Sequence, residues 1–216
     1  MSQSYRPLMV DKDFITIGFT TPYPWNHVSE EAHAISLFLE SDALDFFHIR
    51  KPDADSNYTT SLLSLIPARV YPRLILHSHF ILAQKFTLGG IHCKPGEADP
   101  YIPDYTAQGR MITKSCHSLS ELMSEHPSDY SYRFLSPVFN SISKKGYSSG
   151  FNIDDPRLLE AVSRGPTIAL GGVKPLFFEK IFNAKFAGAA LLGYLWSPKF
   201  SLQNKIDSII SSRIQN

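Results

Sequence analysis

Several features that mark special classes of protein are scarce in this sequence. Two cysteines, Cys93 and Cys116, are too few for a disulfide framework, and no C-x-x-C pair is present for zinc or redox chemistry. The formal net charge is only +1, whereas a nucleic-acid-binding protein normally shows a basic excess. The longest mostly apolar stretch, 186–196, is far shorter than the ~20 residues that a membrane helix needs. These absences argue against secreted disulfide scaffolds, nucleic-acid binders and membrane proteins.

The composition favours one compact domain. The chain has 216 residues, of which 43% are hydrophobic and 19% charged, which is too apolar and too neutral for a disordered segment. No low-complexity tract or linker divides it, so we expect a single domain over 1–216. The first 14 residues show no apolar core of a signal peptide, and the cysteines read as reduced thiols. The sequence therefore predicts a cytoplasmic protein.

Short apolar runs alternate with amphipathic stretches along the chain. Eight runs rich in β-branched and aromatic residues predict strands, at 14–19, 44–49, 74–76, 90–93, 110–114, 130–135, 167–170 and 187–192. Helical spacing and start signals follow most of them. Ser29 is a candidate N-cap, Ser118 and Glu121 form a capping-box pattern, and Pro156 stands at a favoured first helical position.

Eight strand–helix units predict an α/β protein, a (β/α)8 TIM barrel at the small end of the size range of that fold. The alternative is an open doubly wound sheet. No G-x-G-x-x-G follows the first predicted strand, which argues against a dinucleotide-binding version of that alternative.

Polar residues collect where the predicted strands end, which is where barrel enzymes place their chemistry. Five of the eight histidines lie at such ends; they are His48, His77, His79, His92 and His117. Each one alone is more often a hydrogen-bonded structural residue than a catalyst. A zinc site is a weaker alternative, because no fixed ligand spacing appears and His77-x-His79 is non-specific, so we expect no metal ligands.

The loop after the sixth predicted strand has the parts of a phosphate site. Ser141 and Ser143 offer hydroxyls, and Lys144 supplies charge. Gly171 and Gly172, after the seventh strand, allow backbone N–H groups to approach a ligand closely. Gly193 occupies a similar place after the eighth strand. Loops of this composition are usually ordinary solvated turns. Their occurrence together at one end of the predicted barrel favours a phosphorylated ligand.

These segments resemble the superfamily of thiamine phosphate synthases and thiazole tautomerases. The resemblance runs through nearly the whole chain, in LDFFHIRK, RLILHSHF, LGGIHC, TKSCHSLSEL, DYSYRFLSPVFNSISKKGY and TIALGGV. It implies a (β/α)8 barrel and a transferase that couples a hydroxymethylpyrimidine diphosphate to a thiazole phosphate, releasing diphosphate. Its partners would be those small molecules, with no nucleic acid or membrane, and a homodimer is compatible with it.

The resemblance also implies roles for individual residues. Arg50, Ser115 and Lys144 match family positions, and Ser141 and Ser143 stand in for two threonines. We therefore expect Arg50, His117 and Lys144 to be catalytic. The expected substrate-binding residues are His48, Lys51, His77, His92, Ser115, Ser141, Ser143, Gly171, Gly172 and Gly193.

The sequence departs from the synthase pattern at the metal. The family resemblance implies Mg²⁺, but His77 and Ser78 stand where an Asn-Asp pair is expected, and Glu97 or Asp99 are uncertain counterparts of a second acid. Because Mg²⁺ prefers carboxylate oxygen, the expected ligands are partly absent. Two alternatives stay open, a thiazole tautomerase using His117 as acid/base, and a non-catalytic barrel that binds thiamine-related phosphates.

Overall fold

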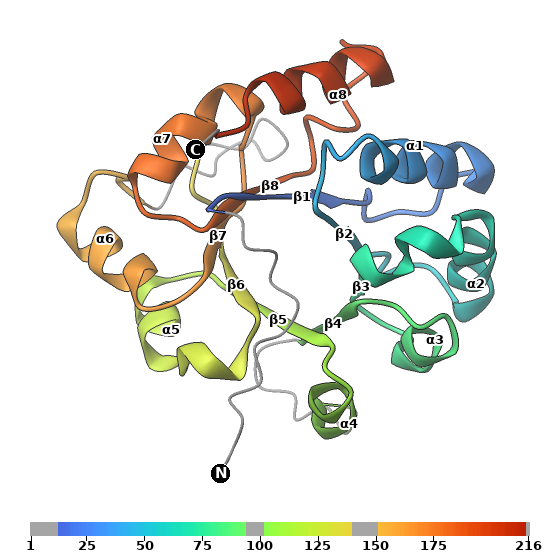
Figure 1. The fold of residues 1–216 in the computed structure, drawn as a ribbon, viewed down its shortest axis with the longest axis horizontal. Helices are drawn as coiled ribbons and strands as arrows, with labels where there is room; N and C mark the ends of the chain where they lie inside the picture. The colour runs from blue at the N-terminus through green and yellow to red at the C-terminus, as the bar shows by residue number, and fades with distance from the viewer. Residues whose placement is uncertain (1–12, 94–101, 140–150, 215–216) are drawn as a thin grey trace.

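The computed structural model describes residues 13–93, 102–139 and 151–214. Eight parallel strands form a closed barrel in chain order, and the ring is completed by pairing of the first strand with the eighth (Figure 1). The strands are β1 (Ile15–Phe19), β2 (Phe46–Ile49), β3 (Leu74–Leu76), β4 (Gly90–Cys93), β5 (Met111–Cys116), β6 (Tyr132–Leu135), β7 (Thr167–Ala169) and β8 (Gly188–Leu191). The predicted (β/α)8 barrel is confirmed.

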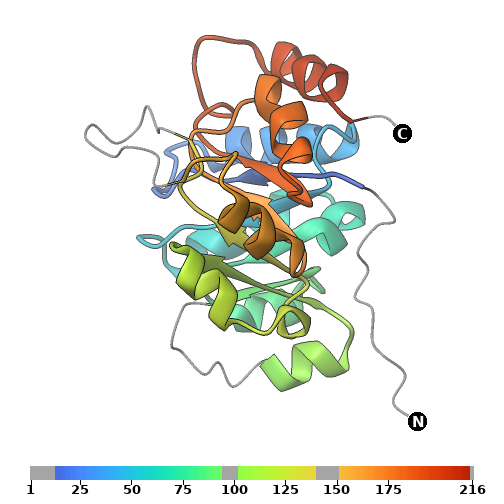
Figure 2. The ribbon, with the colours of Figure 1, turned by 90° about the vertical axis from the view of Figure 1, so that its left-hand side faces the viewer.

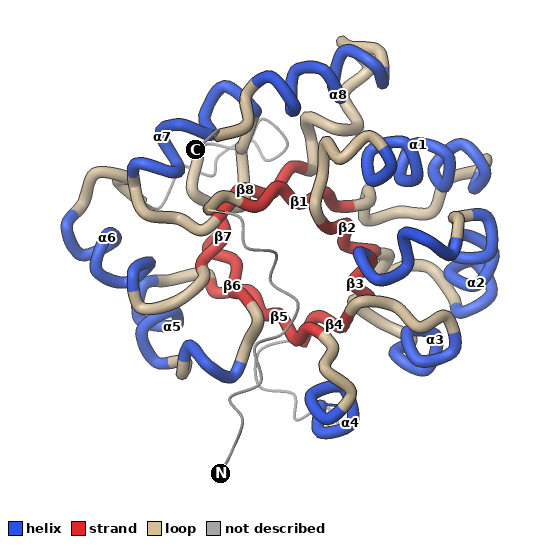
Figure 3. The backbone as a smooth tube through the Cα atoms, viewed as in Figure 1, coloured by secondary structure: helices blue, strands red, loops and turns tan. Residues whose placement is uncertain are grey.

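The helices lie outside the ring of strands, as the tube drawing shows (Figure 3). The α-helices are α1 (Val28–Glu40), α2 (Ser56–Leu65), α3 (Phe80–Lys85), α4 (Ile102–Ala107), α5 (Leu119–Ser124), α6 (Pro156–Ser163), α7 (Phe178–Asn183) and α8 (Leu202–Ser211). Three 3₁₀ helices join them: η1 (Ala68–Arg73), η2 (Pro127–Asp129) and η3 (Pro175–Phe177). In the side view, the orange and red helices α7 and α8 lie above the green α4 and α5 (Figure 2). Within the described ranges, none of these helices has the length and apolarity to cross a membrane.

Two of the three predicted helix starts are confirmed. The Ser118 hydroxyl accepts the backbone N–H of Glu121 at 3.1 Å, and Asp155 caps α6 with Pro156 as its first residue. The prediction for Ser29 is wrong. The N–H of Glu30 already bonds the His27 carbonyl at 3.1 Å, so the first turn begins two residues earlier and Ser29 lies inside it.

Side chains alternate between two cores because successive residues of a strand point to opposite faces. One cluster fills the barrel interior and includes Ile17, Phe46, Ile75, Met111 and Phe134. The larger cluster packs between the strands and the helices. This period of two decides which polar residues near a strand end face the mouth: those an even number of residues from an interior residue face inward.

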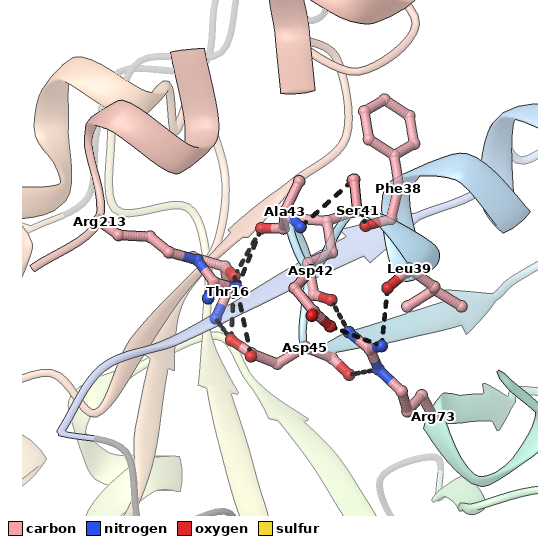
Figure 4. A network of polar contacts seen from close by, with 10 residues as sticks. Thr16, Phe38, Leu39, Ser41, Asp42, Ala43, Asp45, Arg73 and Arg213 are labelled. Atoms are coloured by element: carbon pink, nitrogen blue, oxygen red, sulfur yellow. Dashed lines mark hydrogen bonds and ion pairs between the residues drawn. The ribbon is translucent and has the colours of Figure 1, made fainter. Parts of the chain in front are cut away.

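The opposite end of the barrel is held by a polar network around Asp45, just before β2 (Figure 4). Its carboxylate accepts the Thr16 N–H at 2.7 Å and the Thr16 hydroxyl at 3.0 Å. Arg213, which follows α8, lies 3.3 Å from the same carboxylate. Arg73 donates to the carbonyls of Leu39 and Asp45 at 2.7 and 2.9 Å. The network joins β1, the loop before β2 and the end of α8.

We expect Asp45→Ala to lower the free energy of unfolding by about 3 kcal/mol, because it leaves the buried Thr16 N–H and the Arg213 charge without the carboxylate. Urea unfolding measures the effect. Asp154→Ala is the control, since that side chain is 78% exposed and pairs with Lys180 only at 3.9 Å. Equal losses in the two variants would show that the network contributes nothing specific.

Candidate active site at the barrel mouth

Three histidines from neighbouring strands meet inside the barrel. His48 lies two residues after the interior Phe46, and His77 two residues after the interior Ile75, so both point inward with His92 of β4. One ring nitrogen from each lies within 4.8 Å of the others. His48 Nδ1 is 2.8 Å from His77 Nε2, and the rings of His77 and His92 stack with centroids 4.0 Å apart. The structure therefore brings together three predicted substrate-binding residues.

Hydroxyl groups hold the outer nitrogens of two of these rings. His48 Nε2 lies 2.7 Å from the Tyr132 hydroxyl, and His92 Nδ1 lies 2.8 Å from Thr113 Oγ1. The other nitrogen of His92 is 3.1 Å from Ser115 Oγ, a predicted substrate contact on β5. These bonds fix the ring orientations, with His48 Nδ1 directed at His77 Nε2 and His92 Nε2 directed at Ser115.

Burial keeps the three imidazoles neutral. Burial lowers the pKa of His48 and of His77 well below the ordinary histidine value. Unfavourable interaction with the other imidazoles, and for His77 also with Arg50, lowers both pKa values further. The pKa of His92 falls to about 3, first through burial and then through the positive charges of Arg50 and His117. At neutral pH the cluster thus offers lone pairs and N–H groups but no positive charge.

Arg50 and His117 supply the cationic and titratable groups around the mouth. Arg50 is exposed, and its charge acts on both His77 and His92, which places it beside the cluster. His117 is also exposed, just beyond the end of β5, with Nδ1 3.3 Å from the Ser136 carbonyl. Two of the three predicted catalytic residues, Arg50 and His117, therefore lie on the solvent side of the three histidines.

Lys51 takes another direction. Its side chain is 1% exposed, and its ammonium bonds Glu31 at 2.6 Å, the Tyr23 carbonyl at 2.7 Å and the Thr21 hydroxyl at 3.1 Å. Tyr58 donates to the second oxygen of Glu31 at 3.0 Å. All three N–H donors of Lys51 have a protein partner. The predicted contact between Lys51 and the substrate would therefore require Lys51 to give up one of these three hydrogen bonds.

Lys114 also points away from the mouth, toward α5. Its ammonium lies 2.5 Å from Glu125, and the Tyr130 hydroxyl donates to the other carboxylate oxygen at 3.1 Å. The bond from Lys114 lowers the pKa of Glu125. Lys114 therefore ties β5 to the segment after α5.

We expect this pair to stabilise the fold by about 1 kcal/mol at neutral pH and less in acid. A lowered folded pKa means that the contribution of Glu125 is present above the unfolded value and is lost as pH falls through the folded value. The difference in unfolding free energy between the wild type and Glu125→Gln should shrink between about pH 6 and pH 3. Glu160→Gln, at an exposed position on α6, is the control and should show no such closing gap.

The predicted phosphate residues are described in part. Gly171 and Gly172 follow β7 with φ of +92° and +66°, which only glycine adopts without strain. A Cβ on Gly171 would lie 2.8 Å from Pro137, so this backbone approaches its neighbour closely. Gly193 is exposed after β8. Ser141, Ser143 and Lys144 lie outside the described residues, and their shared anion site stays a prediction.

The described residues do not fit Mg²⁺. In the described part of the chain, the group of three or more potential ligands with converging donor atoms consists of imidazoles only. Mg²⁺ prefers oxygen ligands in octahedral geometry, and His77 with Ser78 supplies no carboxylate. Glu97 and Asp99, the uncertain acidic counterparts, lie outside the described ranges.

Sequence reasoning missed the residues that support the cluster. Tyr132 and Thr113 bond the outer histidine nitrogens, and Phe19 stacks on His48 with centroids 4.7 Å apart. The available signal was the period of two. It assigns Tyr132 and Phe134 to one face of β6, and Met111, Thr113 and Ser115 to one face of β5.

The chain is a closed (β/α)8 barrel with imidazole, guanidinium and hydroxyl groups at the C-terminal ends of its strands, where barrel enzymes place their active sites. The family model for thiamine monophosphate synthase matches residues 27–195. The chain belongs to the thiamine monophosphate synthase family, and the sequence-based prediction of a thiamine-biosynthesis transferase is confirmed at that level.

Individual relatives agree with this assignment. The chain is 20% identical over 168 residues to the thiamine-phosphate synthase of Pelagibacter ubique, covering 76% of this chain and 81% of the relative. A thiamine phosphate pyrophosphorylase structure from Bacteroides thetaiotaomicron is 26% identical with a TM-score of 0.71, over 92% of this chain and 97% of that one. The Pyrococcus furiosus thiamine phosphate pyrophosphorylase shares the fold at 14% identity, with a TM-score of 0.70 over 93% and 95% of the two chains.

Proposed function

We propose that this chain joins a hydroxymethylpyrimidine diphosphate to a thiazole phosphate and releases diphosphate. The bond between the pyrimidine methylene carbon and the diphosphate oxygen breaks, and a bond from that carbon to the thiazole nitrogen forms. The observation that carries the proposal is the gathering of Arg50, Ser115 and the buried histidines at one mouth, in a member of this family. A cytoplasmic location and phosphorylated partners belong to the same proposal.

The residues of the chain would act mainly on charge and position. The Arg50 guanidinium, exposed beside the neutral histidines, would stabilise the negative charge that grows on the departing diphosphate. The positive-φ backbone at Gly171 and Gly172 would present N–H groups to the thiazole phosphate. Lys144, for which the family resemblance implies a catalytic role, would add a second positive charge. The neutral imidazoles and Ser115 would position the pyrimidine by hydrogen bonds.

The test is an incubation of the purified chain with both substrates, with Mg²⁺ and, in parallel, with EDTA. We expect thiamine phosphate and diphosphate to appear in equal amounts. If neither product appears in either incubation, although circular dichroism shows that the protein is folded, the proposal is overturned.

A thiazole tautomerase is the second candidate, and His117 favours it. This imidazole is exposed at the mouth and held from one side by the Ser136 carbonyl at 3.3 Å, so its other nitrogen is available for proton transfer. Isomerisation of a thiazole phosphate carboxylate without synthase activity would assign this reaction. Binding of both phosphates without turnover would instead identify a non-catalytic barrel.

A further inference from the structure

The three inward-facing histidines converge more closely than hydrogen bonding to a pyrimidine would require. His48, His77 and His92 come from three adjacent strands, and their ligand nitrogens lie within 4.8 Å of one another. His48 is fully buried, His92 is 5% exposed, and His77 is half-buried on the side of the mouth. Three imidazoles with one accessible side match the donor set of a catalytic-type metal site, in which the fourth position stays open.

We propose that His48, His77 and His92 bind a divalent transition-metal ion, with Zn²⁺ as the best fit, at the floor of the barrel mouth. Imidazole nitrogen suits Zn²⁺ and its transition-metal neighbours and disfavours Mg²⁺. The proposal does not depend on which substrate the enzyme uses, since metal binding is measured without one.

The outer nitrogens support this assignment. Metal-binding histidines almost always donate their second N–H to a protein group that fixes the ring. Here Tyr132 lies 2.7 Å from His48 Nε2, and Thr113 lies 2.8 Å from His92 Nδ1. With those positions protonated, His48 Nδ1 and His92 Nε2 are the unprotonated nitrogens, and their lone pairs are available to the metal ion.

The distances require a small adjustment. Tetrahedral Zn²⁺ with Zn–N bonds of about 2.0–2.1 Å places its ligand nitrogens roughly 3.3 Å apart. The 2.8 Å between His48 Nδ1 and His77 Nε2 must open slightly, and the others close from at most 4.8 Å. The His77 and His92 rings, now 18° from parallel, must also tilt apart by rotation about χ2, a broad torsion for histidine.

Ser115 lies on the His92 lone pair that would bind the ion, so its hydroxyl must rotate aside when the metal enters. Its hydroxyl is 3.1 Å from His92 Nε2 and half-buried toward the mouth. Rotated aside, it can hydrogen-bond a water molecule or an anionic oxygen in the fourth position. A substrate phosphate or carboxylate oxygen is the class of ligand that such a metal ion would take.

The experiment uses the full chain after removal of metal with EDTA and dialysis. Zn²⁺ is titrated against a chromogenic chelator, and Co²⁺ is titrated separately to record its visible spectrum. We expect one ion per chain, intense Co²⁺ bands typical of a four-coordinate site, and a rise in melting temperature on metal addition. Mg²⁺ in large excess should not displace Zn²⁺.

Variants locate the ion. His77→Ala and His92→Ala should weaken Zn²⁺ binding at least 100-fold, and Tyr132→Phe, which keeps the ring and removes one supporting bond, about 10–100-fold. His33→Ala, at an exposed position on α1, is the matched control and should bind like the wild type. If His92→Ala fails to fold, Tyr132→Phe and His77→Ala still decide. Absence of Zn²⁺ binding in the wild type, or unchanged affinity in both of these variants, would overturn the proposal.

Discussion

Replacing Lys51 by methionine is expected to lower the free energy of unfolding by about 3–5 kcal/mol. The substitution leaves the Glu31 carboxylate, which is fully buried, without the ammonium that now lies 2.6 Å away. Burial raises the pKa of Glu31 and lowers that of Lys51, and their mutual bond opposes both shifts. Removing one partner therefore exposes the whole cost of burying the other charge. Chemical unfolding at neutral pH measures the loss.

Two further variants make this result specific. Arg69→Met removes a pair with Glu40 whose arginine side chain is 69% exposed, and it should cost at most about 1 kcal/mol. The double variant Lys51→Met/Glu31→Leu removes both charges and should recover much of the stability, because apolar replacements of a buried pair are often neutral. A double variant no more stable than Lys51→Met would show that the bonds to Thr21, Tyr23 and Tyr58 matter more than the charge pair.

Replacing Arg50 by alanine is expected to lower synthase turnover by about 10²–10³-fold with little loss of stability. Arg50 is exposed, and its charge acts at the mouth, so its removal should affect the departing diphosphate more than the fold. Steady-state kinetics with both substrates and a melting curve measure the two effects. Arg110→Ala is a matched control, because that guanidinium bonds the Ala83 carbonyl outside the histidine cluster.

The same substitutions separate the two candidate reactions. His117→Ala should reduce a tautomerisation by about 10²–10⁴-fold, the usual contribution of a positioned acid/base, and should reduce the synthase reaction less than Arg50→Ala does. A purely structural His117, bonded to the Ser136 carbonyl, would instead lose stability with little kinetic effect. Equal synthase rates in Arg50→Ala and wild type would remove Arg50 from the mechanism.

Most of the fold could be predicted from local patterns, and the reasons are visible in particular elements. The predicted strand over 90–93 is β4, and the run over 74–76 is β3, because short apolar runs between breakers favour buried strands in an α/β protein. The start of α1 was misplaced because Ser29 has the chemistry of a cap, whereas the helix begins through a backbone bond to His27 that leaves no side-chain signal.

The site was predictable in composition but not in arrangement. The strand-end histidines were identified, but their convergence depends on the register of neighbouring strands, which pairs His48 with Ile75 and His92 with Thr113. Register follows from the closure of all eight strands, which local sequence does not contain. The opposite directions of Arg50 and Lys51, by contrast, continue past Ile49 the alternation of faces along β2. Lys51 could therefore have been assigned to the helix side from the sequence.

The contacts of Arg213 bear on the order in which the barrel is assembled. This residue reaches Thr16 across 197 positions of sequence, and the strand that it helps to hold, β1, pairs with β8. Until a ribosome has produced β8, β1 has no neighbour on that side and β7 is likewise an open edge. Unpaired strand edges recruit strands from other molecules. Closure of the ring thus waits for β8, the last strand, and until β8 pairs with β1 and β7 the barrel has two open edges.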